Sequence, residues 1–187
     1  MTQEKEHAIY EAALELFAER GFAGTAVPHI AQLAGVSVGT IYRYFPDKEA
    51  LVNALFRRWK RTLAAWVGLG LDANAEPREQ FHHIWERLIA FARVHRKALA
   101  FLELHHHAAY LDEASRSVHA ETLAPVDAFF ARLTAADTPP DLTPALRYAI
   151  FWGLFMGLVR AHWQGRLALT PVEIRTAERC CWEAVRG

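Results

Sequence analysis

The chain has 187 residues, and 52% of its side chains are hydrophobic, which suits one or two small domains with a sizeable core. Its 21 basic and 21 acidic residues give a formal net charge of zero, which argues against binding to nucleic acid through overall charge. The longest apolar run, residues 148–159, is too short to span a bilayer, and the N-terminus lacks the apolar segment of a signal peptide. We therefore expect a cytoplasmic protein with no membrane partner.

The first predicted elements are three helices within residues 1–46. Apolar residues at helical spacing predict the first helix from about residue 3 to residue 20. Thr25 is expected to cap a second helix, whose first turn contains Pro28. Gly35 supplies a sharp turn, and Ser37 is expected to cap the third helix. Two helices joined by so short a turn form a helix-turn-helix, whose second helix enters the DNA major groove.

The third helix divides into a packing face and a polar face. Ile41 and Phe45 lie four residues apart and share one face, which is expected to pack on Ile30 and Leu33. On the opposite face Arg43 suits the O6/N7 edge of guanine, while tyrosine and lysine side chains reach phosphate oxygens. The alternative for the tyrosines is a purely structural packing role. The residues expected to contact DNA from this region are Gly39, Thr40, Tyr42, Arg43, Tyr44 and Lys48.

The segment IAQLAGVSVGTIYRYFPDKEAL, residues 30–51, resembles the N-terminal DNA-binding domain of the TetR family of bacterial transcriptional regulators. The resemblance covers about the first third of the chain and rests on many positions at fixed spacing. It implies that the base- and phosphate-contacting positions fall on Thr25, Ser37, Gly39, Thr40, Tyr42, Tyr44 and Lys48. Pro28-His29 departs from the family pattern, in which charged residues are more common, and this leaves a phosphate contact by His29 open.

Positive charge is concentrated near the predicted DNA-binding segment. Between residues 20 and 62 there are seven Lys or Arg residues but only two acidic ones, Asp47 and Glu49. Residues 1–19 are acidic, and the chain after residue 62 is close to neutral. A local basic patch on a neutral protein favours specific DNA binding and limits nonspecific binding.

The remainder of the chain is also predicted to be helical, without strands or internal repeats. The predicted fold is therefore all-α: a three-helix helix-turn-helix domain (1–46), a connecting helix (47–68), and a helical effector-binding and dimerisation domain (69–187). The clearest break is the proline-rich turn at 136–144. The other expected helices span approximately residues 77–95, 97–110, 112–136, 144–164 and 171–186.

The helix at 144–164 has a narrow face of small residues that recur every four positions and would allow close approach of another helix. Burial within one subunit is the alternative. By resemblance to the TetR family, the last two helices pair with those of a second subunit in a homodimer. Of the adjacent Cys180 and Cys181, which could also form a redox switch, we place Cys181 in the interface. The expected interface residues are Ala149, Gly153, Gly157, Ala161 and Cys181.

The histidines allow two interpretations. Glu103 and His107 are one helical turn apart, so metal sensing by the His105–His107 region is geometrically possible. The preferred interpretation is a mostly apolar pocket for a small molecule, with a few hydrogen-bonding groups and no metal or cofactor. The residues expected to line this pocket are Trp85, Phe91, His106, Tyr110, Phe129 and Trp152.

These observations predict a ligand-responsive DNA-binding transcriptional regulator. By family expectation it is a repressor, released from a palindromic double-stranded operator by a small, largely apolar effector. The alternatives are a metal-responsive regulator, or a helical enzyme or ligand-binding protein whose helix-turn-helix is incidental. An enzyme is disfavoured because the sequence contains no nucleophile with its base, no metal shell and no phosphate loop.

Overall fold

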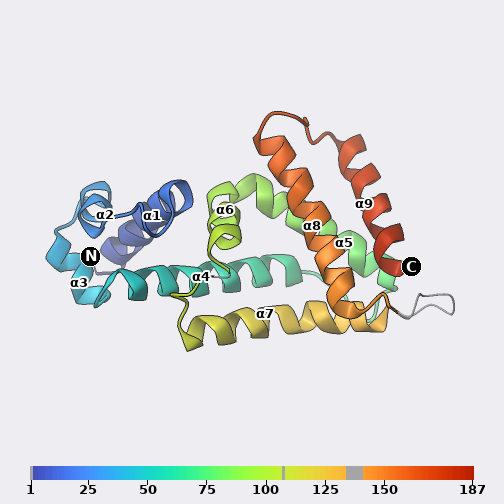
Figure 1. Cartoon of the computed structure of the whole chain (residues 1–187), viewed down its shortest axis with the longest axis horizontal. Helices are drawn as coiled ribbons and strands as arrows, with labels where there is room; N and C mark the ends of the chain where they lie inside the picture. Colours follow the sequence, from blue (N-terminus) through green and yellow to red (C-terminus); the bar gives the residue numbers. More distant parts are fainter. Residues whose placement is uncertain (1, 107, 134–140) are drawn as a thin grey trace. The chain divides into compact units, whose positions relative to one another are not determined.

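The computed structural model describes residues 2–106, 108–133 and 141–187 (Figure 1). All regular secondary structure in these residues is helical, which confirms the predicted all-α class. The helices are α1 (Thr2–Arg20), α2 (Val27–Leu33), α3 (Val38–Tyr44), α4 (Lys48–Gly68), α5 (Pro77–Val94), α6 (Arg96–His105), α7 (Glu113–Arg132), α8 (Pro144–Trp163) and α9 (Pro171–Arg186).

Most helix boundaries agree with the sequence prediction, but the helix predicted at 97–110 is wrong at its C-terminus. α6 ends at His105, and His106 serves as its C-cap, with a backbone N–H that donates to Leu102 O. The Nδ1 atom of the His106 ring lies 2.7 Å from Glu103 O, so the ring binds the carbonyl that a longer helix would use. The predicted turn at 136–144 lies largely outside the described residues.

The chain forms two compact units, each composed of two segments. The first unit contains residues 1–64 and 93–120, and the second contains residues 65–92 and 121–187. α6 therefore belongs to the same unit as the helix-turn-helix. The division at residues 46 and 68 remains a prediction.

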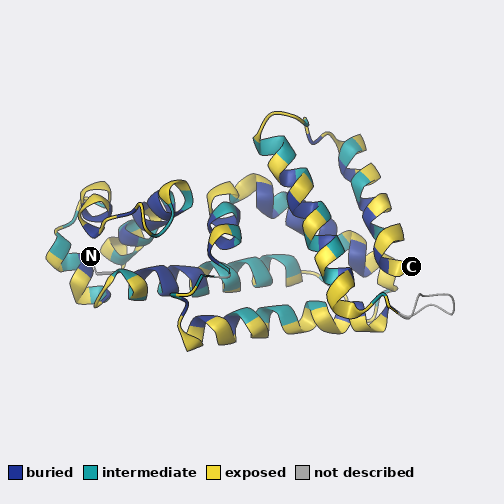
Figure 2. Cartoon of the chain, in the orientation of Figure 1, coloured by how far each residue is buried: buried dark blue, intermediate teal, exposed yellow. Residues whose placement is uncertain are grey.

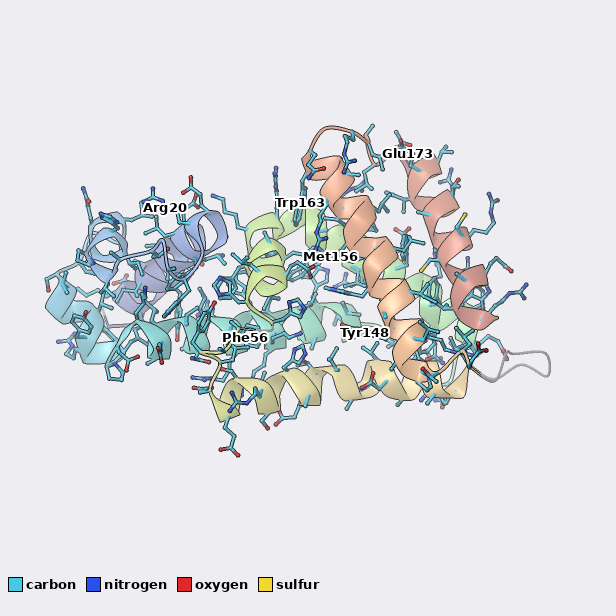
Figure 3. The ribbon with its side chains drawn as sticks, in the orientation of Figure 1. Arg20, Phe56, Tyr148, Met156, Trp163 and Glu173 are labelled. Atoms are coloured by element: carbon cyan, nitrogen blue, oxygen red, sulfur yellow. The ribbon has the colours of Figure 1, made fainter. Side chains whose placement is uncertain are left out.

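The core of the first unit is centred on α1, which packs against α2 and α6. Phe17 of α1 is fully buried, and its ring lies 6.4 Å from that of Phe101 on α6 and 6.2 Å from that of Phe22. Phe56, labelled in Figure 3, is completely buried on α4. These contacts attach the N-terminal helices to α6.

The core of the second unit is an aromatic cluster between α5 and α8. The Trp85 ring lies 6.2 Å from Phe151 and 6.1 Å from Phe155, and Phe130 of α7 lies 5.6 Å from Phe151. α8 also packs along α9, and Figure 2 shows buried positions on both helices. In the described part of the chain, no helix combines the length and apolar character needed to cross a membrane.

Candidate nucleic-acid interface

The turn between α2 and α3 has the predicted geometry. Gly35 adopts a φ of +65°, a conformation that favours glycine. Ser37 is the N-cap of α3, and its hydroxyl oxygen accepts a hydrogen bond of 3.1 Å from the Thr40 N–H. The Asp47 carboxylate accepts a hydrogen bond of 2.7 Å from Ala50 N–H at the start of α4. Local side-chain caps therefore set the start of α3 and the start of α4.

The predicted cap by Thr25 is wrong. The N-cap of α2 is Ala26, which makes no side-chain capping bond. Thr25 is only 2% exposed, and its hydroxyl lies 2.8 Å from Gly21 O and 3.1 Å from Leu16 O. The hydroxyl thus donates toward carbonyls at the C-terminal end of α1. Its buried position gives the side chain a structural role.

The packing face of α3 is confirmed by burial, apart from one residue. Ile41 and Phe45 are 1% and 6% exposed, and Ile30 of α2 is fully buried. Leu33, expected to pack with them, is 54% exposed because it lies off the buried stripe of α2 formed by Val27, Ile30 and Ala31.

The opposite face of α3 presents polar groups to solvent. Tyr42 is 48% exposed, Arg43 and Gly39 are exposed, and Thr40 and Tyr44 are half-buried. The Arg43 guanidinium lies 5.4 Å from the Tyr44 ring centroid, a distance that permits a cation–π contact. A Cβ atom at Gly39 would meet only Ser37 Oγ, at 3.9 Å, so this position leaves the backbone open to a close approach.

Lys48 has a structural role that the sequence did not predict. Its ammonium group donates to Phe22 O at 2.9 Å and Thr25 O at 3.0 Å, and it lies 4.1 Å from the Phe22 ring centroid. These partners precede it by 23 to 26 residues, so no local pattern indicates them. The contacts hold a positive charge beside the segment that leads into α2.

Several side chains of the basic patch predicted between residues 20 and 62 are engaged in contacts within the first unit. Arg57 forms an ion pair of 2.9 Å with Asp112, and the Arg58 guanidinium lies 5.0 Å from the Tyr10 ring centroid. Burial lowers the pKa of Lys60 to about 8, a shift that nearby Glu103 partly opposes. The local excess of basic residues therefore overstates the positive charge available to DNA.

Comparisons with known protein families decide the identity of this arrangement. Residues 9–55 match the family of bacterial regulatory proteins described as tetR, and residues 56–187 match the tetracyclin repressor-like C-terminal domain. The chain belongs to the TetR family. This assignment confirms the interpretation of the chain as a transcriptional regulator rather than an enzyme, because the similar proteins that carry names are regulators.

Among curated relatives, the HTH-type transcriptional regulator RutR of Escherichia coli K12 is 50% identical over 54 residues, which are 29% of this chain and 26% of RutR. The repressor KstR2 of Mycobacterium tuberculosis H37Rv is 33% identical over 111 residues, 58% of this chain and 50% of KstR2. The matches thus span between about a quarter and half of the relatives' length. A TetR-family regulator from Marinobacter aquaeolei VT8 matches with a TM-score of 0.81 at 25% identity, over 97% of this chain and 95% of that protein.

The residues expected to line an effector pocket divide between the two units. His106 and Tyr110 belong to the first unit, whereas Trp85, Phe91, Phe129 and Trp152 belong to the second. In the second unit Trp85 and Trp152 both contact Phe155, with ring centroids 6.1 Å and 5.4 Å away. Phe129 lies 5.2 Å from Phe130, a member of the same aromatic cluster. Phe91 instead contacts Trp66, at 6.0 Å.

The consecutive histidines do not form a metal cluster in the described residues. His105 is fully buried, its Nδ1 atom is hydrogen-bonded to the Tyr110 hydroxyl, and its Nε2 atom lies 3.5 Å from Phe17 O. The His106 ring binds the Glu103 carbonyl, and His107 lies outside the described residues. The sequence did not predict that His105 would lie in the core.

Acidification should weaken the first unit through His105. Burial lowers the pKa of this imidazole below its ordinary 6.5, although the bond to Phe17 O opposes the shift. As the pH falls through 6.5 the unfolded chain takes up a proton first, so stability is lost until the lower pKa of the folded state is passed. The wild type should lose up to about 1.4 kcal/mol per pH unit more than His105→Gln in this window. Urea unfolding at several pH values measures this, with exposed His7→Gln as the control; parallel curves for wild type and His105→Gln would refute it.

The small-residue face of α8 is open in the single chain. Ala149, Gly153 and Gly157 are exposed, and Ala161 is half-buried. A Cβ atom built on either glycine would meet none of the described residues within 4 Å. Cys181, the fifth expected interface residue, is instead fully buried within the second unit. Burial, with a smaller effect of Cys180, raises the pKa of the Cys181 thiol to about 12, which keeps it protonated and unreactive.

Proposed function

We propose that the chain binds a double-stranded DNA operator through α3. The observation that carries this proposal is the exposed polar face of α3. This helix is the second helix of the helix-turn-helix, and Ser37 caps its start. Arg43 is assigned to a base edge, because a guanidinium can donate two hydrogen bonds to guanine. Tyr42, Tyr44 and Thr40 are assigned to backbone or base contacts, and the Gly39 backbone to close approach. Lys48 is assigned to electrostatic attraction of the DNA backbone by the positive charge that it holds beside α2.

The proposed regulator is a homodimer that reads a palindromic site. A two-fold dimer presents two copies of α3 to half-sites about one helical turn or a multiple of it apart. The open small-residue face of α8 supports the proposal, because glycine costs about 1 kcal/mol in a helix interior. Among the described residues, nothing packs within 4 Å of where a Cβ atom of Gly153 or Gly157 would stand. α9 supplies the neighbouring surface, since it packs along α8.

The proposed effector is a small, largely apolar molecule that carries a hydrogen-bond acceptor. The aromatic cluster of the second unit supplies the apolar surroundings. Two buried donors of that unit, Trp85 Nε1 and Arg147 Nη1, have no hydrogen-bond partner in the described structure. A buried donor without a partner is costly, so a carbonyl or carboxylate oxygen from a ligand would be stabilising there. Release of DNA by this effector makes the protein a repressor.

Operator selection from random DNA, followed by a thermal-shift screen of small molecules, tests the whole proposal. We expect a palindromic consensus and at least one stabilising compound that changes operator affinity by roughly 5- to 150-fold. Because coupling is reciprocal, operator DNA must weaken binding of that compound by the same factor. Failure to select any sequence would contradict the DNA-binding proposal. A consensus bound equally well with every stabilising compound would contradict only the effector proposal.

A further inference from the structure

Three metal-ligating side chains meet between α5 and α9 in the second unit. His82 and Glu86 are exposed and lie one turn apart on α5, whereas Glu178 of α9 is only 2% exposed. Each residue offers one ligand atom, and these atoms all lie within 4.8 Å of one another. No other such group of three is found among the described residues. None of these residues belongs to the DNA-reading face or to the aromatic cluster.

The donor set suits a first-row divalent metal ion. Zinc binds imidazole nitrogen and carboxylate oxygen at about 2.0–2.2 Å in a tetrahedral shell, which separates neighbouring ligand atoms by about 3.4 Å. His82 Nδ1 already lies 3.0 Å from Glu178 Oε2. The side chains of His82 and Glu86 are exposed on the same face of α5, so rotamer adjustments of both can complete the approach.

The charge at this cluster also favours a cation. A buried carboxylate such as Glu178 requires a partner, and here it binds Arg78 Nη1 at 2.5 Å as well as the His82 ring. With a neutral imidazole, two carboxylates and one guanidinium give a formal charge of −1. The Arg78 side chain is 44% exposed and binds Glu178 Oε1, so it competes with a metal ion for that oxygen of the carboxylate. It does not bind the other oxygen, Oε2, which lies nearest His82.

We propose that His82, Glu86 and Glu178 bind one Zn²⁺ ion, or a similar first-row divalent ion, with water completing its coordination shell. The ion would join α5 to α9 through ligands, His82 and Glu178, that lie 96 residues apart in sequence. The site is independent of the proposed operator and apolar effector, and it differs from the His105–His107 region that the sequence suggested. The sequence did not reveal it, because the His82 and Glu86 pair is common on helices and its third ligand lies 96 residues from His82.

Zinc titration of the full chain against a chromophoric chelator tests the site. We expect one Zn²⁺ per chain with micromolar or tighter affinity, and at least 10-fold weaker binding for His82→Ala and for Glu86→Gln, since even outer-shell changes cost roughly 10- to 100-fold. Both changes are at exposed positions, so the fold should be retained. Arg78→Gln should bind zinc more tightly than the wild type, because it frees Glu178 Oε1.

Two matched controls separate this site from other zinc ligands. His83→Ala removes the neighbouring histidine, whose Nε2 atom lies 3.2 Å from Val67 O, and Cys180→Ser removes the exposed thiol of α9. Both controls should bind zinc as the wild type does. The proposal is overturned if the wild type binds no zinc at micromolar protein concentration. It is equally overturned if binding survives both His82→Ala and Glu86→Gln, or if either control abolishes it.

Discussion

Replacing Gly157 with leucine should separate the proposed dimer into monomers. The Cβ direction of Gly157 is open in the single chain, so the new side chain does not disturb its own fold. Against a second subunit it would overlap the facing helix, and overpacking costs about 1–3 kcal/mol per site. A two-fold interface contains the change twice, which raises the dimer dissociation constant by roughly 30-fold to 10⁴-fold.

Sedimentation velocity across a dilution series measures this effect. Gly68→Leu is a matched control, because Gly68 is an exposed helical glycine of α4 with equally open surroundings and lies outside the small-residue face. The control should sediment as the wild type does. A wild type that remains monomeric at micromolar concentration would refute the proposed assembly. A Gly157→Leu protein that dimerises normally would show that α8 is not the interface.

The sequence predicted the elements whose causes are local. The turn at Gly35 and the cap by Ser37 depend on the backbone preference of glycine and on a hydroxyl three residues from its partner. Helix boundaries from Pro77 and Pro171 were also predictable, because proline is accepted in a first turn. Local rules thus determine most of the helix-turn-helix and most helix ends.

The errors arose where tertiary contacts decide between two local possibilities. A threonine before a helix can cap it or bond elsewhere, and burial beside α1 directs Thr25 to the carbonyls of α1. A histidine in a run of three can be solvated or buried, and the bond to Tyr110 requires His105 in the core. Neither outcome follows from residue spacing.

Long-range polar contacts were beyond the sequence altogether. Asn53 of α4 is 2% exposed, donates to Tyr110 O at 2.8 Å, and accepts a hydrogen bond from Asp112 N–H at 2.9 Å. It joins α4 to the segment between α6 and α7, more than fifty residues away. The apolar stripe of α4 was visible in the sequence, but a polar residue within it gives no indication of its partner.

The helix-turn-helix should lose DNA sequence specificity when Arg43 is replaced by alanine. Arg43 is exposed in the last turn of α3 and is its only basic residue. If it donates to guanine O6 and N7, its loss costs about 1–3 kcal/mol of discrimination at one base position in each half-site. The selected consensus should therefore become degenerate at one symmetric pair of positions, while the rest of the palindrome is retained.

Lys48→Ala provides the contrasting result. Its ammonium group holds a positive charge beside α2, where it is proposed to attract one phosphate. Its loss should therefore weaken binding to all sequences alike and reduce the salt slope by about one. Because the side chain also makes two charged hydrogen bonds, urea unfolding must accompany the binding titrations. The free energy of unfolding of Lys48→Ala is expected to fall by at most roughly 1.5–3 kcal/mol for each lost bond. Operator selection from random DNA with both variants separates base reading from attraction of the DNA backbone. A uniform loss of affinity in Arg43→Ala, with the consensus unchanged, would move Arg43 from the base edge to a phosphate.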